Sequence, residues 1–117
     1  MDEITIENAK KFHLLMDTLQ SNPSTNTYFQ NLKRIWKFIC KELKHDLQYP
    51  TTCNYENSNI ILVWSNSQDY SELEINESGF VSMLFQIKNG STLYETDSQT
   101  YTLPTLQWVN FMRSMSS

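Results

Sequence analysis

The residues with the greatest potential for metal or nucleophilic chemistry are two cysteines and two histidines, and their spacing argues against both. Three or four convergent ligands hold a metal ion, but the chain has no C-x-x-C, H-E-x-x-H or H-x-H motif. Cys40 and His45 are five residues apart on one predicted helix, about 140° apart around its axis. A cysteine nucleophile needs a base within hydrogen-bond reach, and only the fold could bring His13 or His45 to Cys53. We therefore expect a non-enzymatic protein with no catalytic residue, metal or cofactor.

Glycines and cysteines are scarce, which narrows the chemistry further. The 2 glycines do not form a phosphate-binding loop of the G-x-x-x-x-G-K-[ST] or G-x-G-x-x-G type, and no G-x-S-x-G sequence marks a nucleophilic serine. The 2 cysteines do not form a disulfide framework. We expect Cys40 and Cys53 to be reduced and at least one of them to be buried, since a free cysteine packs as a small apolar residue.

Carboxylates are the more promising functional groups, because they are concentrated in one half of the chain. Residues 49–117 carry 7 Asp or Glu against 2 Lys or Arg, whereas residues 1–48 carry 6 against 7. Glu72 and Glu74 share one face of a predicted strand, although such pairs also keep edge strands from aggregating. An acidic surface attracts a basic protein, and tyrosines are common in binding hot spots. We predict that the partner-binding surface consists of Tyr70, Glu72, Glu74, Glu77, Glu95 and Asp97.

The cations gather on one face of the second predicted helix. Opposite its apolar residues this helix carries Lys33, Arg34, Lys37, Lys41 and Lys44. A nucleic acid could contact these cations, but the net charge of −4 would repel its phosphates elsewhere. Aromatic residues that stack on bases are not interleaved with the lysines, apart from Phe38. We expect a solvated helix face and no nucleic-acid partner.

Apolar periodicity predicts the helices that position these groups. The first runs from about Thr5 to Gln20, with Thr5 as its N-cap, and the second from about Tyr28 to Leu47. The third runs from Pro104, at the first helical position, to about Met115. Its apolar stripe contains Leu106, and Trp108 at the edge of the stripe is a candidate for an exposed aromatic side chain. The short loop after the first helix favours a helical hairpin.

A block of strands lies between the second and third helices, where β-branched and aromatic residues become frequent. The predicted strands are Thr51–Tyr55, Asn59–Ser65, Tyr70–Ile75, Phe80–Ile87 and Leu93–Thr96. Ile60–Trp64 is apolar on both faces, which is typical of a central strand, and Asn89-Gly90 predicts a type I′ hairpin turn. The fold class is α+β: an N-terminal helical hairpin, an antiparallel meander of four or five strands and a C-terminal helix packed on the sheet, in a single domain spanning 1–117.

These patterns lead us to expect a protein-binding or inhibitor protein. The most specific version of this expectation is a small microbial immunity protein or a phage-type anti-defence protein, whose acidic sheet face binds a basic partner protein. A secretion-type chaperone or adaptor acting as a homodimer, and a small enzyme with an unrecognised site, remain alternatives, as do a monomer and a homodimer. The acidic N-terminal segment lacks the apolar region of a signal peptide. The longest apolar run, Ile60–Trp64, is too short to cross a bilayer, so we expect a cytoplasmic protein without a membrane partner.

Overall fold

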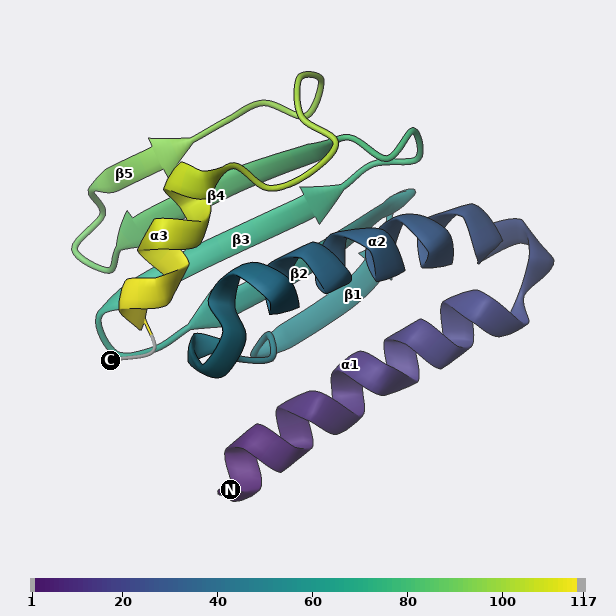
Figure 1. Ribbon diagram of the computed structural model, residues 1–117, viewed down its shortest axis with the longest axis horizontal. Coiled ribbons are helices and arrows are strands. Elements are labelled where there is room, and N and C mark those ends of the chain that lie inside the picture. Colours follow the sequence, from purple (N-terminus) through teal and green to yellow (C-terminus); the bar gives the residue numbers. More distant parts are fainter. Residues whose placement is uncertain (1, 116–117) are drawn as a thin grey trace.

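The computed structural model describes residues 2–115, which form three α-helices and five β-strands (Figure 1). The helices are α1 (Glu3–Ser21), α2 (Asn26–Leu43) and α3 (Leu106–Met115). The strands are β1 (Thr52–Glu56), β2 (Asn59–Ser65), β3 (Asp69–Ile75), β4 (Val81–Ile87) and β5 (Thr92–Glu95). Short 3-10 helices, Pro23–Thr25 and Lys44–Asp46, follow α1 and α2. The predicted α+β class, with a pair of helices before the sheet and one after it, is confirmed.

All five strands form one antiparallel sheet in the order β1-β2-β3-β4-β5, so each strand pairs with its neighbour in sequence. Tight turns can join antiparallel neighbours, as a meander requires. Leu62 of β2 lies opposite Cys53 of β1 and Leu73 of β3, and Leu73 lies opposite Met83 of β4. The run Ile60–Trp64 falls in β2, which is paired on both sides, while β3 is the middle strand of the sheet.

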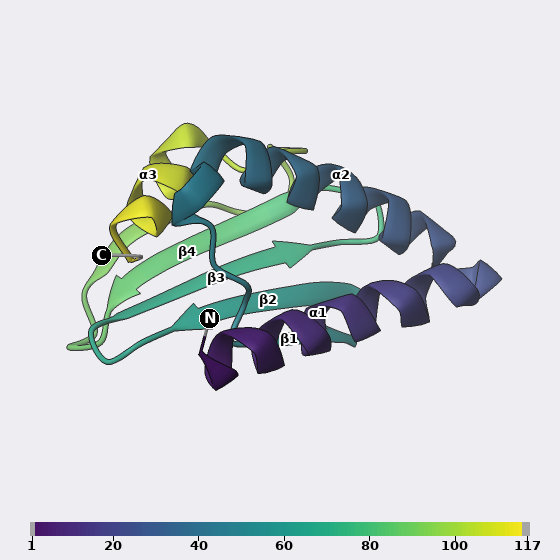
Figure 2. The ribbon, with the colours of Figure 1, turned by 60° about the horizontal axis from the view of Figure 1, so that its bottom comes forward.

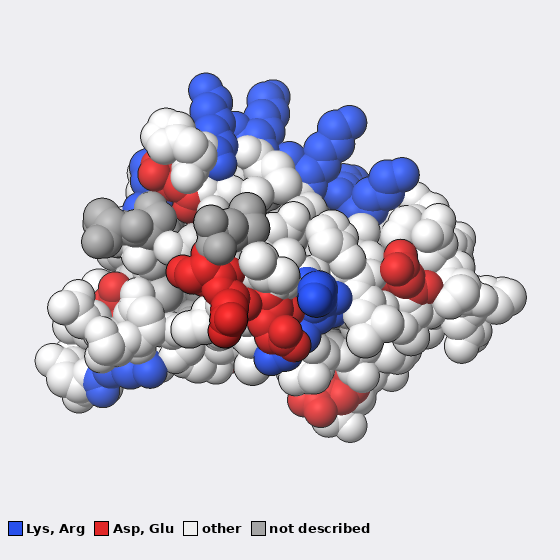
Figure 3. All heavy atoms as spheres, turned by 90° about the horizontal axis from the view of Figure 1, so that it is seen from below, with Lys and Arg blue, Asp and Glu red and all other residues white. Residues whose placement is uncertain are grey.

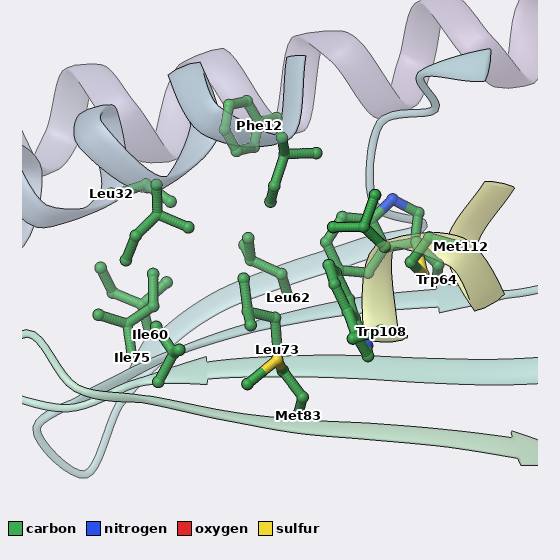
Figure 4. Close-up of a cluster of buried hydrophobic side chains, with 14 of the residues drawn as sticks. Phe12, Leu32, Ile60, Leu62, Trp64, Leu73, Ile75, Met83, Trp108 and Met112 are labelled. Carbon is green, nitrogen blue, oxygen red and sulfur yellow. The ribbon is translucent and has the colours of Figure 1, made fainter. Parts of the chain in front are cut away.

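Helices α2 and α3 lie over one face of the sheet, above the strands in Figure 2, and α1 runs beside α2 along the edge strand β1. Alternate residues of β2, β3 and β4 point to this face and are buried, because successive side chains of a strand point to opposite faces. Leu62, Leu73 and Met83 rise from adjacent strands toward α1 and α2 (Figure 4). Trp64 and Trp108 meet edge to face with ring centroids 5.5 Å apart. The core therefore lies between this face and the helices.

The ends of α1 and α2 differ from the predicted ends for reasons of local chemistry. The Asp2 carboxylate accepts a hydrogen bond of 2.8 Å from the backbone N–H of Thr5. Asp2 is therefore the N-cap of α1, and the prediction for Thr5 is wrong. The second helix ends before Lys44 and does not continue to Leu47, because Lys44 adopts φ 53° and ψ −120°. This conformation is not α-helical, and residues other than glycine rarely adopt it.

The start of α3 also differs from the prediction. The Oγ1 atom of Thr105 accepts a hydrogen bond of 3.3 Å from the backbone N–H of Trp108, as an N-cap does. Pro104 therefore precedes the helix and is not its first residue. Trp108 is 0% exposed and Leu106 is 59% exposed, which reverses the predicted places of these two side chains. The helix has turned its tryptophan, not Leu106, into the core.

The hairpin turns contain residues with positive φ, and only part of the prediction for the turn at Asn89-Gly90 is confirmed. Asn57 and Ser58 both have positive φ (51° and 65°) between β1 and β2, as a type I′ turn requires. Between β4 and β5 only Gly90 has positive φ (102°), and Asn89 does not share it. The hairpin at Asn89-Gly90 is present, but its predicted turn type is wrong. A turn closed by one left-handed glycine joins the strands instead.

Candidate functional site

The face of the sheet opposite the helices carries the predicted acidic residues. We call it the open face, since α2 and α3 pack on the other side and α1 runs along the edge strand β1 (Figure 2). Tyr70, Glu72 and Glu74 point to it from β3, because the residues that alternate with them, Ser71 and Leu73, are buried in the core. Across the strands, the open face also includes Asn54, Ile61, Val63, Ser82, Leu84, Gln86 and Glu95.

The strand register sets carboxylates among apolar side chains. Glu72 lies opposite Val63 on one side and Leu84 on the other, and Leu84 lies opposite Glu95. In the next row, Glu74 lies opposite Ile61 and a serine of β4. Glu72 and Glu74 are two residues apart on one strand, which separates them by about 7 Å. The centre of the open face is thus a mixed acidic and apolar surface.

Two hydrogen bonds orient the central carboxylates. The hydroxyl of Tyr70 donates to Oε2 of Glu72 at 2.9 Å, and Nδ2 of Asn59 donates to Oε1 of Glu74 at 2.8 Å. Burial raises the pKa of Tyr70, and the hydrogen bond to Glu72 and its negative charge raise it further, to about 12. Each donor is neutral, so the negative charges of Glu72 and Glu74 are held in place and not neutralised.

No cation balances these charges on the sheet itself. The five strands contain no Lys or Arg. Within residues 2–115, the recorded ion pairs both involve Asp46, which contacts His45 and Arg113 far along the chain from the strand carboxylates. If a helix of this chain covered the open face, it would bury uncompensated carboxylates, at a cost of several kcal/mol per ion. The acidic middle strand therefore disfavours packing of a helix of this chain on this face.

The other two predicted contact residues lie beyond the ends of the strands. Glu77 is exposed in the turn between β3 and β4. Its charge contributes to raising the pKa of Tyr28, after burial and Tyr55. Asp97 follows β5 and accepts hydrogen bonds from the backbone N–H of Gln99 and the hydroxyl of Thr100. The strand register thus brings together Tyr70, Glu72, Glu74 and Glu95, and it does not include Glu77 or Asp97.

The structure changes the interpretation of the acidic pair and adds apolar residues to the surface around it. Glu72 and Glu74 lie on the middle strand, so protection of a sheet edge does not explain them. The apolar members of the open face, Ile61, Val63 and Leu84, were absent from the predicted surface, and all three are half-exposed. Ile61 and Val63 belong to the run that is apolar on both faces, from which a central strand is predicted and no contact residue. Strand parity relative to Glu72 could have assigned them to the acidic side.

The cysteines and histidines do not assemble into a site among the described residues. Cys40 and Cys53 are free and both half-buried, so the prediction that at least one of them is buried is wrong. Burial raises the pKa of both thiols, which disfavours the reactive thiolate. The Nε2 atom of His13 lies 3.3 Å from the Tyr49 hydroxyl, and no contact with Cys53 is recorded for it. Residues 2–115 contain no group of three or more His, Cys, Asp or Glu that could hold a metal ion.

A groove separates α1 from the edge strand β1. It has a volume of about 460 Å³, and its walls include Lys11, Leu14, Leu15 and Cys53. Leu14 is 67% exposed, so part of the groove wall is apolar surface in contact with solvent.

Among the described helices, none is both long and apolar enough to cross a membrane.

Comparisons of the chain with protein-family models, curated proteins and solved structures found no match. The open face offers a sheet surface with oriented carboxylates, apolar neighbours and no Lys or Arg on its strands, a combination suited to contact with a positively charged protein surface.

Proposed function

We propose that this chain is a non-enzymatic protein-binding protein whose open face occupies a basic surface of another protein. The single observation that carries the proposal is the pair Glu72 and Glu74 on the middle strand, without a cation on any strand. A partner that covers them must bring its own positive charges, because burying an unpaired carboxylate costs several kcal/mol. The proposed contacts are Tyr70, Glu72, Glu74 and Glu95 on the open face, together with Glu77 and Asp97 beyond the ends of the strands.

The mixture of groups supports a specific contact and not general solubility. Half-exposed Ile61, Val63 and Leu84 surround the carboxylates and would contribute roughly 25 cal/mol for each Å² of apolar surface covered. Fixed charges then set the orientation and the rate of association. An inhibitor of a basic enzyme works this way, and we propose an immunity protein for a nuclease toxin or a phage-type antagonist of a defence enzyme as its most specific form.

Charge reversal on the open face tests the proposal. The variant Glu72→Lys/Glu74→Lys and the control Glu7→Lys/Asp17→Lys change the net charge equally, but the control residues are exposed on α1. Each is used as bait in native lysate, after circular dichroism has verified folding. We expect the control and the original protein to capture the same basic partner and the open-face variant to lose it. Equal capture by the open-face variant would refute the proposed face.

The groove between α1 and β1 favours a second candidate, the chaperone or adaptor. An extended segment beside an edge strand and a helix is a known mode of peptide recognition, and exposed Leu14 offers an apolar wall for it. The substitution Leu14→Glu separates the two candidates. If it abolishes capture of the partner while Glu72→Lys/Glu74→Lys does not, the adaptor function replaces the inhibitor function.

A further inference from the structure

A row of lysines runs along the side of α2 that faces away from the core. Figure 3 shows Lys and Arg side chains projecting from the helical side of the molecule, at the top of the view. We call the exposed residues Lys33, Lys37, Lys41 and Lys44 the basic ridge. At 100° per residue the three lysines within α2, Lys33, Lys37 and Lys41, fall within an arc of about 80°, and the four-residue steps are about 6 Å along the axis. Lys44 directly follows the end of the helix. The sheet lies between the basic ridge and the open face, because α2 packs on the opposite side.

The contacts of the basic ridge leave its charges available. Lys33 lies 6.0 Å from the centre of the Phe29 ring. No ion pair or side-chain hydrogen bond is recorded within residues 2–115 for Lys37, Lys41 or Lys44. The neighbouring Arg34 is different, since its guanidinium donates to the backbone oxygen of Thr102 at 2.7 Å. The ridge is therefore a row of accessible ammonium groups, and Arg34 serves the fold.

The backbone at Lys44 is a second, independent observation. Its φ of 53° with ψ −120° is a strained conformation for a residue with a side chain. Glycine would remove this strain, and the exposed side chain makes no recorded contact within residues 2–115 that explains a lysine. Strained residues persist preferentially at functional positions. The lysine therefore points to a use for positive charge at this end of the ridge.

We infer that the basic ridge of one copy of this chain docks on the open face of a second copy. The charges and their spacing fit: the ridge presents ammonium groups about 6 Å apart, and Glu72 and Glu74 are about 7 Å apart. A helix laid along β3 places Lys37 and Lys41 over the two carboxylates. The aliphatic stems of the lysines then cover the apolar neighbours of the carboxylates, as lysine stems commonly do.

The position of the two surfaces sets the form of the assembly. They lie on opposite sides of the sheet, so a copy can use both surfaces at once. Contacts between unlike surfaces are heterologous and produce open chains unless the rotation closes a ring. Each exposed ion pair contributes little, so association is weak, grows with protein concentration and is sensitive to salt. The inference rests on the proposed function in one respect, the use of the open face to bind cations.

The test uses the protein itself, with sedimentation velocity over a range of concentrations. In about 20 mM salt, where the Debye length is near 20 Å, we expect the weight-average mass to increase with concentration. In about 0.5 M salt, where the Debye length is near 4 Å, the monomer should remain. A monomer at every concentration in low salt would overturn the inference. Capture of a basic partner by the open face would still stand in that case, so the two failures are distinguishable.

Charge exchange gives the sharper result. The variants Glu72→Lys/Glu74→Lys and Lys37→Glu/Lys41→Glu should each weaken self-association at least about tenfold, and an equimolar mixture of the two should restore it. The control Lys10→Glu/Lys88→Glu changes the net charge by the same amount as the ridge variant, but at residues outside the ridge. It should self-associate like the original protein. A mixture that stays monomeric refutes the pairing of ridge and face.

A nucleic acid is the competing occupant of the ridge. A fluorescent random-sequence single-stranded oligonucleotide is titrated in the same low salt. Binding that Lys37→Glu/Lys41→Glu abolishes, in a protein that does not self-associate, would assign the ridge to phosphates and overturn our inference. Absence of such binding together with salt-sensitive self-association supports it.

Discussion

Replacement of Lys44 by glycine should stabilise this protein, although it removes a charged side chain. The N–H of Lys44 closes the last turn of α2 on the carbonyl of Cys40, and the backbone then adopts φ 53° and ψ −120°. A Cβ atom disfavours this conformation and glycine accepts it freely. The Lys44→Gly substitution therefore releases strain while the recorded hydrogen bonds of the backbone persist.

The expected gain follows from two opposing terms. Release of strain contributes about 1–3 kcal/mol, and the greater freedom of glycine in the unfolded chain costs about 0.5–1 kcal/mol. The net gain is about 1 kcal/mol. With an unfolding entropy of about 2.1 cal/mol/K per residue, a chain of 117 residues should melt about 4 °C higher.

Thermal and urea unfolding followed by circular dichroism measure this gain, and alanine at the same position supplies the control. Lys44→Ala removes the charge but keeps Cβ and its strain, so its free energy of unfolding should stay within about 0.5 kcal/mol of the original. A destabilised glycine variant, or an alanine variant stabilised as much as the glycine variant, would refute the reasoning from backbone strain.

Three further predictions concern the core, the open face and α1. Trp108→Ala removes a fully buried side chain and should lower the free energy of unfolding by about 3–5 kcal/mol in urea titrations; a loss below about 1 kcal/mol would contradict its place in the core. The pKa of Tyr70 in the folded protein, about 12, is above its ordinary value of 10.0. The contribution of Tyr70 to the free energy of unfolding is therefore complete below pH 10 and declines as the pH rises through 12. Ultraviolet titration should show that Glu72→Gln lowers the pKa of Tyr70, and an unchanged pKa contradicts their hydrogen bond. The pKa of Asp2 is lowered by its hydrogen bonds to Thr5; its stabilisation is present above 3.8 and lost as pH falls through the folded pKa, so acid unfolding of Asp2→Ala should lack this contribution.

The elements of the fold follow from local patterns, and their ends do not. The period of the apolar residues is enough to predict α2 and the alternation in β3, because both patterns repeat over several turns or residues. The choice of Asp2 over Thr5 as N-cap depends on one hydrogen bond. The early end of α2 depends on a strained residue, Lys44, which propensity disfavours. Trp108 shows the same limit, since packing against Trp64 overrides its place at the edge of the helical stripe.

The sequence is enough to predict which residues of the candidate site share a strand face, but not that this face of the sheet is left uncovered by helices. Alternation along β3 places Glu72 and Glu74 together on one face, and the structure has them there. Sequence patterns do not reveal how helices divide between the two faces of a sheet, so the run Ile60–Trp64 does not show that Ile61 and Val63 are half-exposed beside the carboxylates. Pairing of Leu84 with both Glu72 and Glu95 depends on long-range register, which local patterns do not fix.

Methyl NMR of the protein bound to its captured partner tests the central claim most directly. The account predicts that the methyl resonances of Ile61, Val63 and Leu84 shift on binding. Those of Leu14 and Leu106, which are 67% and 59% exposed on the helices, should stay in place. Shifts confined to Leu14 or Leu106, with the three open-face residues unchanged, would contradict a partner docked on the open face.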